Sequence, residues 1–139
     1  MGRYDEAFVN FQKAINIDPN YIDAYWNRGN LYKDLGKSQK ALDDYNRVIS
    51  INPRFLKGDV YAIRGVMKRE LSDYQGALED YSKALQINPN NTQVYMNRGF
   101  LKRKFLNDNQ GALEDYSRGI KVKRDEYNQK AELYNERGA

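Results

Sequence analysis

Four arginines stand immediately before a glycine and three residues after a tyrosine, and they are Arg28, Arg64, Arg98 and Arg137. A guanidinium group presents a planar fork of donors that binds a carboxylate or a phosphate through two parallel hydrogen bonds. The recurrence therefore predicts one of two roles. The arginines either form a ladder of cations that binds a ligand, or they make ion pairs within the fold.

Residue types that carry catalysis are scarce. The 139 residues include no cysteine and no histidine, so thiolate chemistry and the usual general base at neutral pH are missing. Acidic residues occur as adjacent pairs, such as Asp43-Asp44, whose side chains diverge by about 100° on a helix. The sequence has no phosphate-binding loop and no metal-ligand motif. We expect no enzyme, no catalytic residue, no cofactor and no metal site.

Charge raises the alternative of a nucleic-acid partner. The net charge is +4, and basic residues gather in "KRK" at 102–104 and "KVKR" at 121–124. However, the 23 basic residues are interspersed with 19 acidic ones, which favours a solvated helical surface with surface ion pairs. No apolar run approaches the roughly 20 residues of a membrane span, and no export signal opens the chain. We expect a cytoplasmic protein with no membrane partner.

An internal repeat organises the chain. Four alanines, Ala7, Ala41, Ala77 and Ala112, are spaced by 34, 36 and 35 residues, and each stands in a similar segment. A second kind of segment precedes the later three, "YWNRGNLY", "YAIRGVMK" and "YMNRGFLK". Each repeating unit therefore contains two segments.

Both segments have the pattern of amphipathic helices. Ala41, Tyr45, Val48 and Ile51 recur at helical spacing and give one apolar stripe. Prolines in "IDP" and "INP" predict where the second helices end. A helix pair of this length cannot bury its stripe alone, so neighbouring pairs must stack into a solenoid.

The chain resembles the tetratricopeptide repeat (TPR) family. The family pattern is an aromatic residue, Leu-Gly, Tyr, then Ala, an aromatic residue and Pro. The copy that fits it best has Tyr25, Gly29, Tyr32, Ala41, Tyr45 and Pro53. In the last copy, Arg124 replaces the proline and Gly119 replaces a small apolar residue. The resemblance implies an all-α fold, a right-handed superhelix of antiparallel helix pairs, with close packing at Gly29, Ala41, Gly65, Ala77, Gly99 and Ala112.

The repeat boundaries predict three complete pairs between two half-repeats. Residues 1–20 match only a second helix, and 125–139 match only a first helix. The complete pairs are predicted at 21–55, 56–91 and 92–124. Half-repeats leave apolar faces without the polar caps of terminal repeats. We expect either a piece of a longer solenoid or a chain that self-associates through its open ends.

The arginines depart from the family pattern, which has leucine before the glycine. On a helical wheel they face the second helix of their own pair, where a buried charge needs a partner. The sequence predicts these pairs to be Arg28 with Asp44, Arg64 with Asp80, and Arg98 with Asp115. The unpartnered first segment has Asn10 at the aspartate position. A ligand-binding ladder stays open as the alternative.

The resemblance places a ligand groove along one face of the first helices. It carries that face onto Trp26, Asn27, Asn30 and Lys33, then Val66 and Arg69, then Met96, Asn97, Phe100, Arg103 and Lys104. Large apolar residues on an exposed face mark a contact surface. The alternative for Trp26 and Phe100 is that they pack under the next repeat. Acidic Asp23 and Asp59 at the start of the face disfavour a clamp for a C-terminal carboxylate.

We therefore expect a protein–protein interaction module that holds a peptide or a partner's helix in its concave groove. The partner would have apolar anchors and some acidic groups, because the basic residues lie late along each first helix. Two alternatives are a structural solenoid that assembles through its half-repeats and, less favoured, a nucleic-acid-binding helical repeat.

Overall fold

The computed structural model describes residues 2–138, and within them the fold is all-α. Met1 and Ala139, at the ends of the predicted segments 1–20 and 125–139, lie outside the described residues. The helices in chain order are α1 (Arg3–Ile17), α2 (Ile22–Asp34), α3 (Ser38–Ile51), the short 3-10 helix η1 (Phe55–Gly58), α4 (Asp59–Glu70), α5 (Tyr74–Ile87), α6 (Thr92–Lys104) and α7 (Asn109–Arg137).

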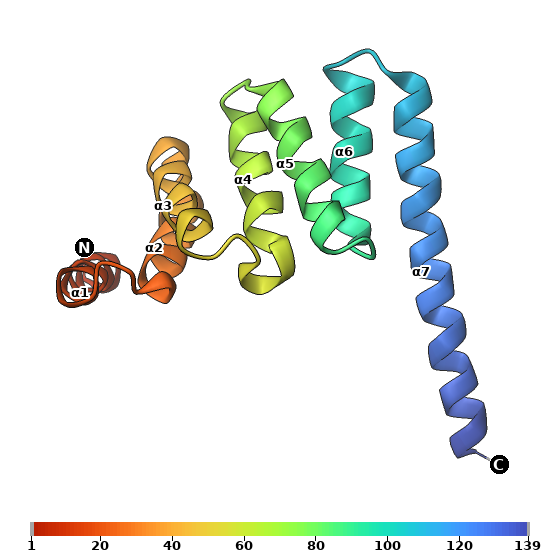
Figure 1. The fold of residues 1–139 in the computed structure, drawn as a ribbon, viewed down its shortest axis with the longest axis horizontal. Helices are drawn as coiled ribbons and strands as arrows, with labels where there is room; N and C mark the ends of the chain where they lie inside the picture. The colour runs from red at the N-terminus through yellow and green to blue at the C-terminus, as the bar shows by residue number, and fades with distance from the viewer. Residues whose placement is uncertain (1, 139) are drawn as a thin grey trace.

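The helices form antiparallel pairs that stack in one row. Helices α2 and α3, α4 and α5, and α6 and α7 pack against each other, and α1 packs on α2 (Figure 1). Neighbouring pairs meet where α3 contacts α4 and where α5 contacts α6. The predicted all-α solenoid of the TPR superhelix type is confirmed.

Proline ends the second helices where the sequence predicts. Helix α3 ends at Ile51, before Asn52-Pro53, and α5 ends at Ile87, before Asn88-Pro89. A tyrosine of α6 stabilises the turn after α5, because the Tyr95 hydroxyl donates to the Pro89 carbonyl oxygen at 2.9 Å.

The link between α3 and α4 is longer than the others, which accounts for the 36-residue spacing. It contains η1, with Leu56 and Lys57 at positive φ angles of 50° and 55°. Gly58 follows at φ 85°, a conformation that glycine adopts without steric cost. The link places Phe55 against the apolar interior of the first complete pair.

The last part of the chain differs from the prediction. The sequence predicts a helix end near Arg124 and a separate first helix over 125–139, but α7 runs without a break as 29 residues. No proline or glycine occurs between Ile120 and Arg137, and Arg124 stands where the other second helices are followed by proline. Residues such as Lys, Glu and Gln in this stretch favour helix continuation. The second half of α7 consequently extends beyond the stacked pairs (Figure 1).

Two apolar clusters form the core, and each crosses a boundary between pairs. One joins Tyr45 and Val48 of α3 to Val60 and Met67 of α4. The other joins α5 to α6, where Tyr81 and Ala84 meet Val94, Tyr95 and Leu101. Stacking of pairs is therefore what buries the core, as expected for a repeat protein.

Among the described residues, no helix has both the length and the apolar character that crossing a membrane requires.

Candidate functional site

Three of the four repeated arginines point inward onto aspartates of their own helix pair. Each makes two hydrogen bonds, from Nε and Nη2, to the two carboxylate oxygens, and each aspartate is buried. The Nη2–Oδ1 distances are 2.7 Å for Arg28–Asp44, 2.7 Å for Arg64–Asp80 and 2.6 Å for Arg98–Asp115. The structure thus brings together the three pairs that the sequence predicts. This bidentate geometry is the strongest form of side-chain ion pair.

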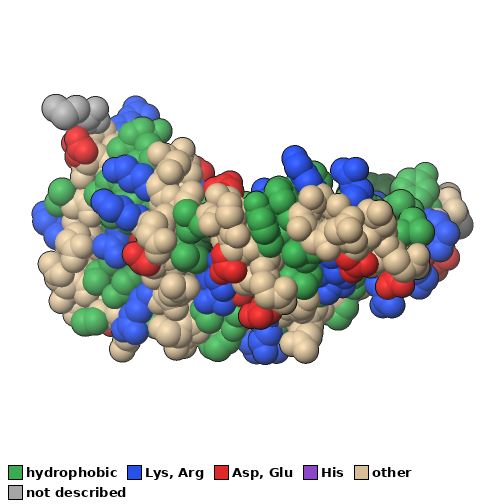
Figure 2. Space-filling model, turned by 90° about the horizontal axis from the view of Figure 1, so that it is seen from above, with side chains coloured by type: hydrophobic (Ala, Val, Ile, Leu, Met, Phe, Trp, Pro, Cys, Tyr) green, Lys and Arg blue, Asp and Glu red, His purple; other side chains and the backbone are tan. Residues whose placement is uncertain are grey.

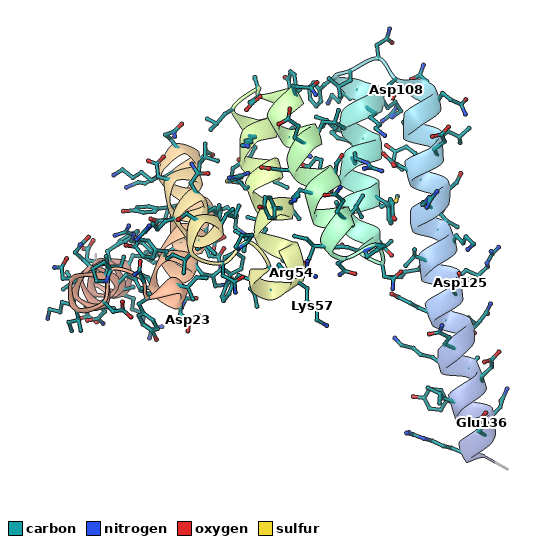
Figure 3. All side chains as sticks on the ribbon, viewed as in Figure 1. Asp23, Arg54, Lys57, Asp108, Asp125 and Glu136 are labelled. Atoms are coloured by element: carbon teal, nitrogen blue, oxygen red, sulfur yellow. The ribbon has the colours of Figure 1, made fainter. Side chains whose placement is uncertain are left out.

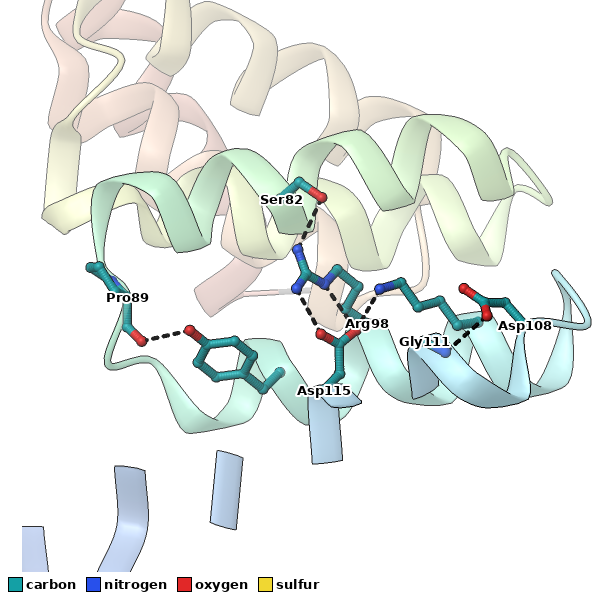
Figure 4. Close-up of polar contacts among 8 residues, drawn as sticks. Ser82, Pro89, Arg98, Asp108, Gly111 and Asp115 are labelled. Atoms are coloured by element: carbon teal, nitrogen blue, oxygen red, sulfur yellow. Dashed lines mark hydrogen bonds and ion pairs between the residues drawn. The ribbon is translucent and has the colours of Figure 1, made fainter. Parts of the chain in front are cut away.

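Each of these arginines also reaches the preceding helix pair. Its Nη1 donates to the residue that follows the aromatic position in the earlier second helix, at 3.1 to 3.2 Å. The acceptors are Gln12 for Arg28, Asn46 for Arg64 and Ser82 for Arg98. Figure 4 shows Arg98 bound to both Asp115 and Ser82. One arginine therefore ties three helices together.

The aspartates differ in how many cations they hold. Lys68 lies 3.2 Å from Asp80 and Lys102 lies 3.0 Å from Asp115, so these two carboxylates each contact an arginine and a lysine. In the first complete pair, Tyr32 stands at the lysine position, and its ring lies 6.0 Å from the Arg28 guanidinium carbon. The hydrogen bond to Asp44 is the main cause that raises the pKa of Arg28.

The glycine after each arginine is a point of close helix contact. A Cβ atom on Gly65 would lie 2.8 Å from Cε1 of Tyr81, and one on Gly99 would lie 2.8 Å from Cε1 of Tyr116. A larger residue would force the helices apart. The "RG" dipeptide therefore serves the scaffold in the stacked pairs. Arg137, the fourth arginine, is exposed at the end of α7.

One predicted groove residue has a structural role instead. The buried Tyr45 hydroxyl donates to Oδ1 of Asn30 at 2.7 Å, so this amide is already engaged. In the next pair, Val66 occupies the place of Asn30, and among the described residues the Tyr81 hydroxyl has no hydrogen-bond partner. Burial is the main cause that raises the pKa of Tyr81.

Trp26, another predicted groove residue, is half-buried rather than free on the surface. Its ring centroid lies 5.7 Å from that of Tyr45 and 5.9 Å from that of Phe55, which comes from the link to the next pair. This is the packing role that the sequence left open as the alternative. Of its neighbours on α2, Asn27 is exposed and Lys33 lies 3.8 Å from Asp34.

The other predicted groove residues split between packing and exposure. Val66 is half-buried and contacts both core clusters. Met96 is exposed, but its sulfur lies within 3.3 Å of the place where a Cβ on Gly119 would be, so the small residue in α7 makes room for it. Asn97 is half-buried and accepts from Nε2 of Gln93 at 3.0 Å.

A group of cations and aromatic rings gathers where α4 and α6 end and α5 begins. The Arg69 guanidinium carbon lies 5.7 Å from the Phe100 ring centroid, and Lys104 Nζ lies 5.3 Å from the same ring. Phe105 stacks on Tyr74 with a centroid distance of 4.3 Å and contacts Phe100 edge-on at 6.1 Å. We call these residues, Arg69, Tyr74, Phe100, Lys104 and Phe105, the cation–aromatic cluster.

The cluster differs electrostatically from the arginine–aspartate pairs. Within residues 2–138, Arg69, Arg103 and Lys104 have no carboxylate within 4.0 Å, whereas Arg64, Lys68, Arg98 and Lys102 all do. These cations can therefore bind an external acidic group without breaking an internal ion pair. We did not predict Tyr74 or Phe105 from the sequence. The available signal for Phe105 was its place directly after "KRK". Figure 3 shows the side chains that project from the ends of these helices.

Comparison with known families decides the classification. A "TPR repeat" profile matches residues 1–36 and 65–103, and a "Tetratricopeptide repeat" profile matches 22–55. The chain belongs to the tetratricopeptide repeat family. TPR domains bind protein partners, and protein–protein interaction is the typical role of the family.

Curated relatives match over one to two repeats of this TPR chain. Hsp70-Hsp90 organizing protein 3 of Arabidopsis thaliana is 38% identical over 56 residues, which is 40% of this chain and 10% of that protein. Heat shock protein STI1 of Saccharomyces cerevisiae is 42% identical over 57 residues, 40% of this chain and 10% of that protein. Tetratricopeptide repeat protein 36 of Caenorhabditis elegans is 43% identical over 49 residues, 35% of this chain and 27% of that protein. The chain thus spans a small part of each relative.

Solved structures match over nearly the whole TPR chain. A crystal structure of MamA superposes with a TM-score of 0.81 over 88% of this chain and 70% of that one, at 21% identity. MamA 41-end from Desulfovibrio magneticus RS-1 gives a TM-score of 0.79 over 89% of this chain and 68% of that one, at 20% identity. At these identities the likeness shows the fold alone.

Proposed function

We propose that this TPR chain is a non-catalytic protein–protein interaction module that holds a peptide segment or a partner's helix along its first helices. The cation–aromatic cluster would anchor the ligand. The observation that carries the proposal is the contrast between paired and unpaired cations. Arg69, Arg103 and Lys104 lack a carboxylate partner within residues 2–138, on a surface that also offers large rings.

Charge along the first helices supports an acidic ligand. Asp23 and Asp59 lie in the first turns of α2 and α4, whereas basic residues occupy the last turns of α2, α4 and α6. The same polarity also suits the helix dipoles. A ligand with acidic groups near the ends of α4 and α6 would meet attraction there and repulsion at the starts of α2 and α4.

The apolar part of the site supports an anchored ligand rather than a purely electrostatic one. Phe100 is half-buried, and Met96 and Phe105 are exposed by more than a third. Aromatic anchors beside cations are the residue types that dominate interface energies. Seen from above, the molecule is bowed and hollowed along one edge, a shape that suits an elongated ligand (Figure 2).

Internal contacts remove two residues from the groove that the sequence predicts. Asn30 is engaged by Tyr45, and Trp26 packs on two core rings, so truncation of either would act on the fold. We propose Asn27, Met96, Asn97 and Arg103 as the peripheral contacts of the site. Asn27 is exposed and can both donate to and accept from a peptide backbone.

A peptide display selection tests the proposal. A library of random 12-residue peptides is selected on the immobilised chain, and the affinity of the best peptide is measured by fluorescence anisotropy. We expect selected peptides to combine Asp or Glu with large apolar residues. The variant Arg69→Gln/Lys104→Gln should bind the best peptide at least about tenfold more weakly, a change of roughly 1.4 kcal/mol.

The matched control carries the same charge change on the second helices. Lys13 and Lys83 are exposed on α1 and α5, so Lys13→Gln/Lys83→Gln should leave the affinity within about twofold. Equal losses in the two double variants would show that net charge rather than the cluster binds the peptide. Selected peptides without acidic residues would contradict the proposal outright.

A further inference from the structure

The outer face of α7 carries an unpartnered apolar stripe. Leu113, Ile120, Tyr127 and Tyr134 recur every seven residues, so they lie along one side of the helix. Leu113 and Ile120 are 60% and 63% exposed, and Tyr127 and Tyr134 are 73% and 76% exposed. The buried residues of α7, among them Ala112 and Asp115, belong to the opposite side, which packs on α6.

In the interior of the solenoid the same positions are covered. Leu85 of α5 stands where Ile120 stands in α7, and it is only 7% exposed. It shares a core cluster with Tyr95 of α6, the first helix of the next pair. The stripe of α7 therefore corresponds to the surface of α5 on which the first helix of the next pair stacks.

The second half of α7 has the sequence of such a first helix. Tyr134, Arg137 and Gly138 repeat the spacing of Tyr, Arg and Gly in α2, α4 and α6. Because this segment continues α7 as one helix, it projects away from the stripe and does not cover it (Figure 1). A second copy of the chain has a free segment of the same kind.

We propose that two copies of this chain pair through α7, antiparallel and about a two-fold axis. The second half of each α7 covers the stripe in the first half of the other. This pairing goes beyond the proposed peptide site, which lies on α2, α4, α5 and α6 and does not depend on it. A mutual exchange of this kind closes as a dimer and leaves neither stripe open.

Contacts inside the solenoid set the register of the pairing. Leu85 meets Tyr95 in the core, so Ile120 should meet Tyr134 of the second copy. Arg98 donates to Ser82, so Arg137 should lie opposite Ser117 of the second copy. Both equivalences place Tyr127 opposite itself, on the two-fold axis.

Charge favours the antiparallel direction. Residues 116–124 contain four basic residues, Arg118, Lys121, Lys123 and Arg124, and no acidic one. Residues 125–137 contain the acidic Asp125, Glu126, Glu132 and Glu136 against the basic Lys130 and Arg137. In this register antiparallel pairing sets residues 116–124 against 130–138, where two acidic residues balance two basic ones, whereas parallel pairing sets the four cations against their own copies.

A head-to-tail arrangement fits less well. It would set the segment 127–138 of one copy against α1 of another, to complete a helix pair. The second helices of the complete pairs offer Asp44, Asp80 or Asp115 to their arginine, but α1 has Asn10 at that position. Arg137 would then lie against a neutral amide. In the proposed α7 pairing, Arg137 lies at the edge of the interface, next to the hydroxyl group of Ser117 of the second copy and accessible to water.

A single cysteine tests the axis, because the chain has no cysteine of its own. Under mild oxidation, Tyr127→Cys should give a disulfide-linked dimer on a non-reducing gel. Gln129→Cys is the matched control, since residue 129 lies about 200° further round the helix. We expect cross-linking at residue 127 to be at least about tenfold faster. Equal rates at both positions, or no dimer from Tyr127→Cys, would overturn the two-fold pairing.

Charge exchange tests the direction and the register. Sedimentation equilibrium of the wild-type chain should show a species of twice 16.3 kDa that dissociates on dilution. Ile120→Lys and Tyr134→Glu, which the register sets opposite each other, should each weaken the dimer by about tenfold, and the double variant should recover part of the loss. A monomer at all concentrations, a series of larger oligomers, or a double variant weaker than both singles would each contradict the proposal.

Discussion

Helices α5 and α7 contain the same eight residues, "QGALEDYS", at 75–82 and 110–117, yet only one copy is covered on both sides. The sides that face the first helix of the same pair agree closely. Ala77 and Ala112 are buried, and Asp80 and Asp115 each hold an arginine and a lysine. The outer sides differ, because Leu78 is half-buried against the core cluster that joins α5 to α6, whereas Leu113 is exposed.

The comparison separates two kinds of interface in this TPR chain. Contacts within a helix pair follow from the local sequence, so they are the same wherever the octapeptide occurs. Contacts between pairs depend on whether a neighbour is present. Within residues 2–138 no further pair stacks on α7, so Leu113 is exposed although it repeats Leu78 of α5.

The largest difference is expected for truncation of the stacking residue in each helix. Leu85→Ala should lower the free energy of unfolding by about 2 to 4 kcal/mol, because the removed side chain leaves a cavity between α5 and α6. Ile120→Ala should cost less than about 0.5 kcal/mol in dilute solution, since the side chain is exposed there. Urea denaturation of both variants measures the contrast.

The protein concentration should affect the stability costs of these two variants differently. If α7 pairs with a second copy, the cost of Ile120→Ala should grow as the protein concentration rises, whereas the cost of Leu85→Ala should change much less. Equal costs in dilute solution would show that the two outer faces are buried alike, and the comparison would fail.

A smaller, stabilising effect is expected inside α4. Val66→Asn would give the Tyr81 hydroxyl the kind of acceptor that Asn30 gives Tyr45. The new hydrogen bond should raise the free energy of unfolding by up to about 1 kcal/mol, reduced by the apolar contacts that valine loses. Thermal unfolding of this variant beside Val66→Ala distinguishes the hydrogen bond from the loss of volume.

Much of the fold could be predicted from the sequence, because the repeat applies the same local rules several times. Proline positions gave the ends of α3 and α5, and the arginine and aspartate spacing gave the three ion pairs. Both depend on residues close in sequence or on one face of a helix pair, where periodicity determines which side chains meet.

The features that the sequence did not predict depend on contacts between different helix pairs or on the absence of a helix-breaking residue. The continuity of α7 follows from the absence of any helix breaker after Ile120, a weaker cue than the repeat that predicted a break. Trp26 turned inward because the long link brings Phe55 to it, and the stacking of Tyr74 on Phe105 joins two different pairs. Helical wheels of single segments do not contain such contacts.

The central claim is that the repeated arginines hold the solenoid while other cations meet the ligand, and a double-mutant cycle at Arg28 and Asp44 tests it most directly. Among the described residues, Arg28 is the only cation within 4.0 Å of Asp44. Arg28→Leu should therefore lower the free energy of unfolding by about 3 kcal/mol, and Arg28→Leu/Asp44→Leu should recover most of this loss. Wild-type stability of Arg28→Leu, together with lost affinity for the selected peptides, would contradict the claim.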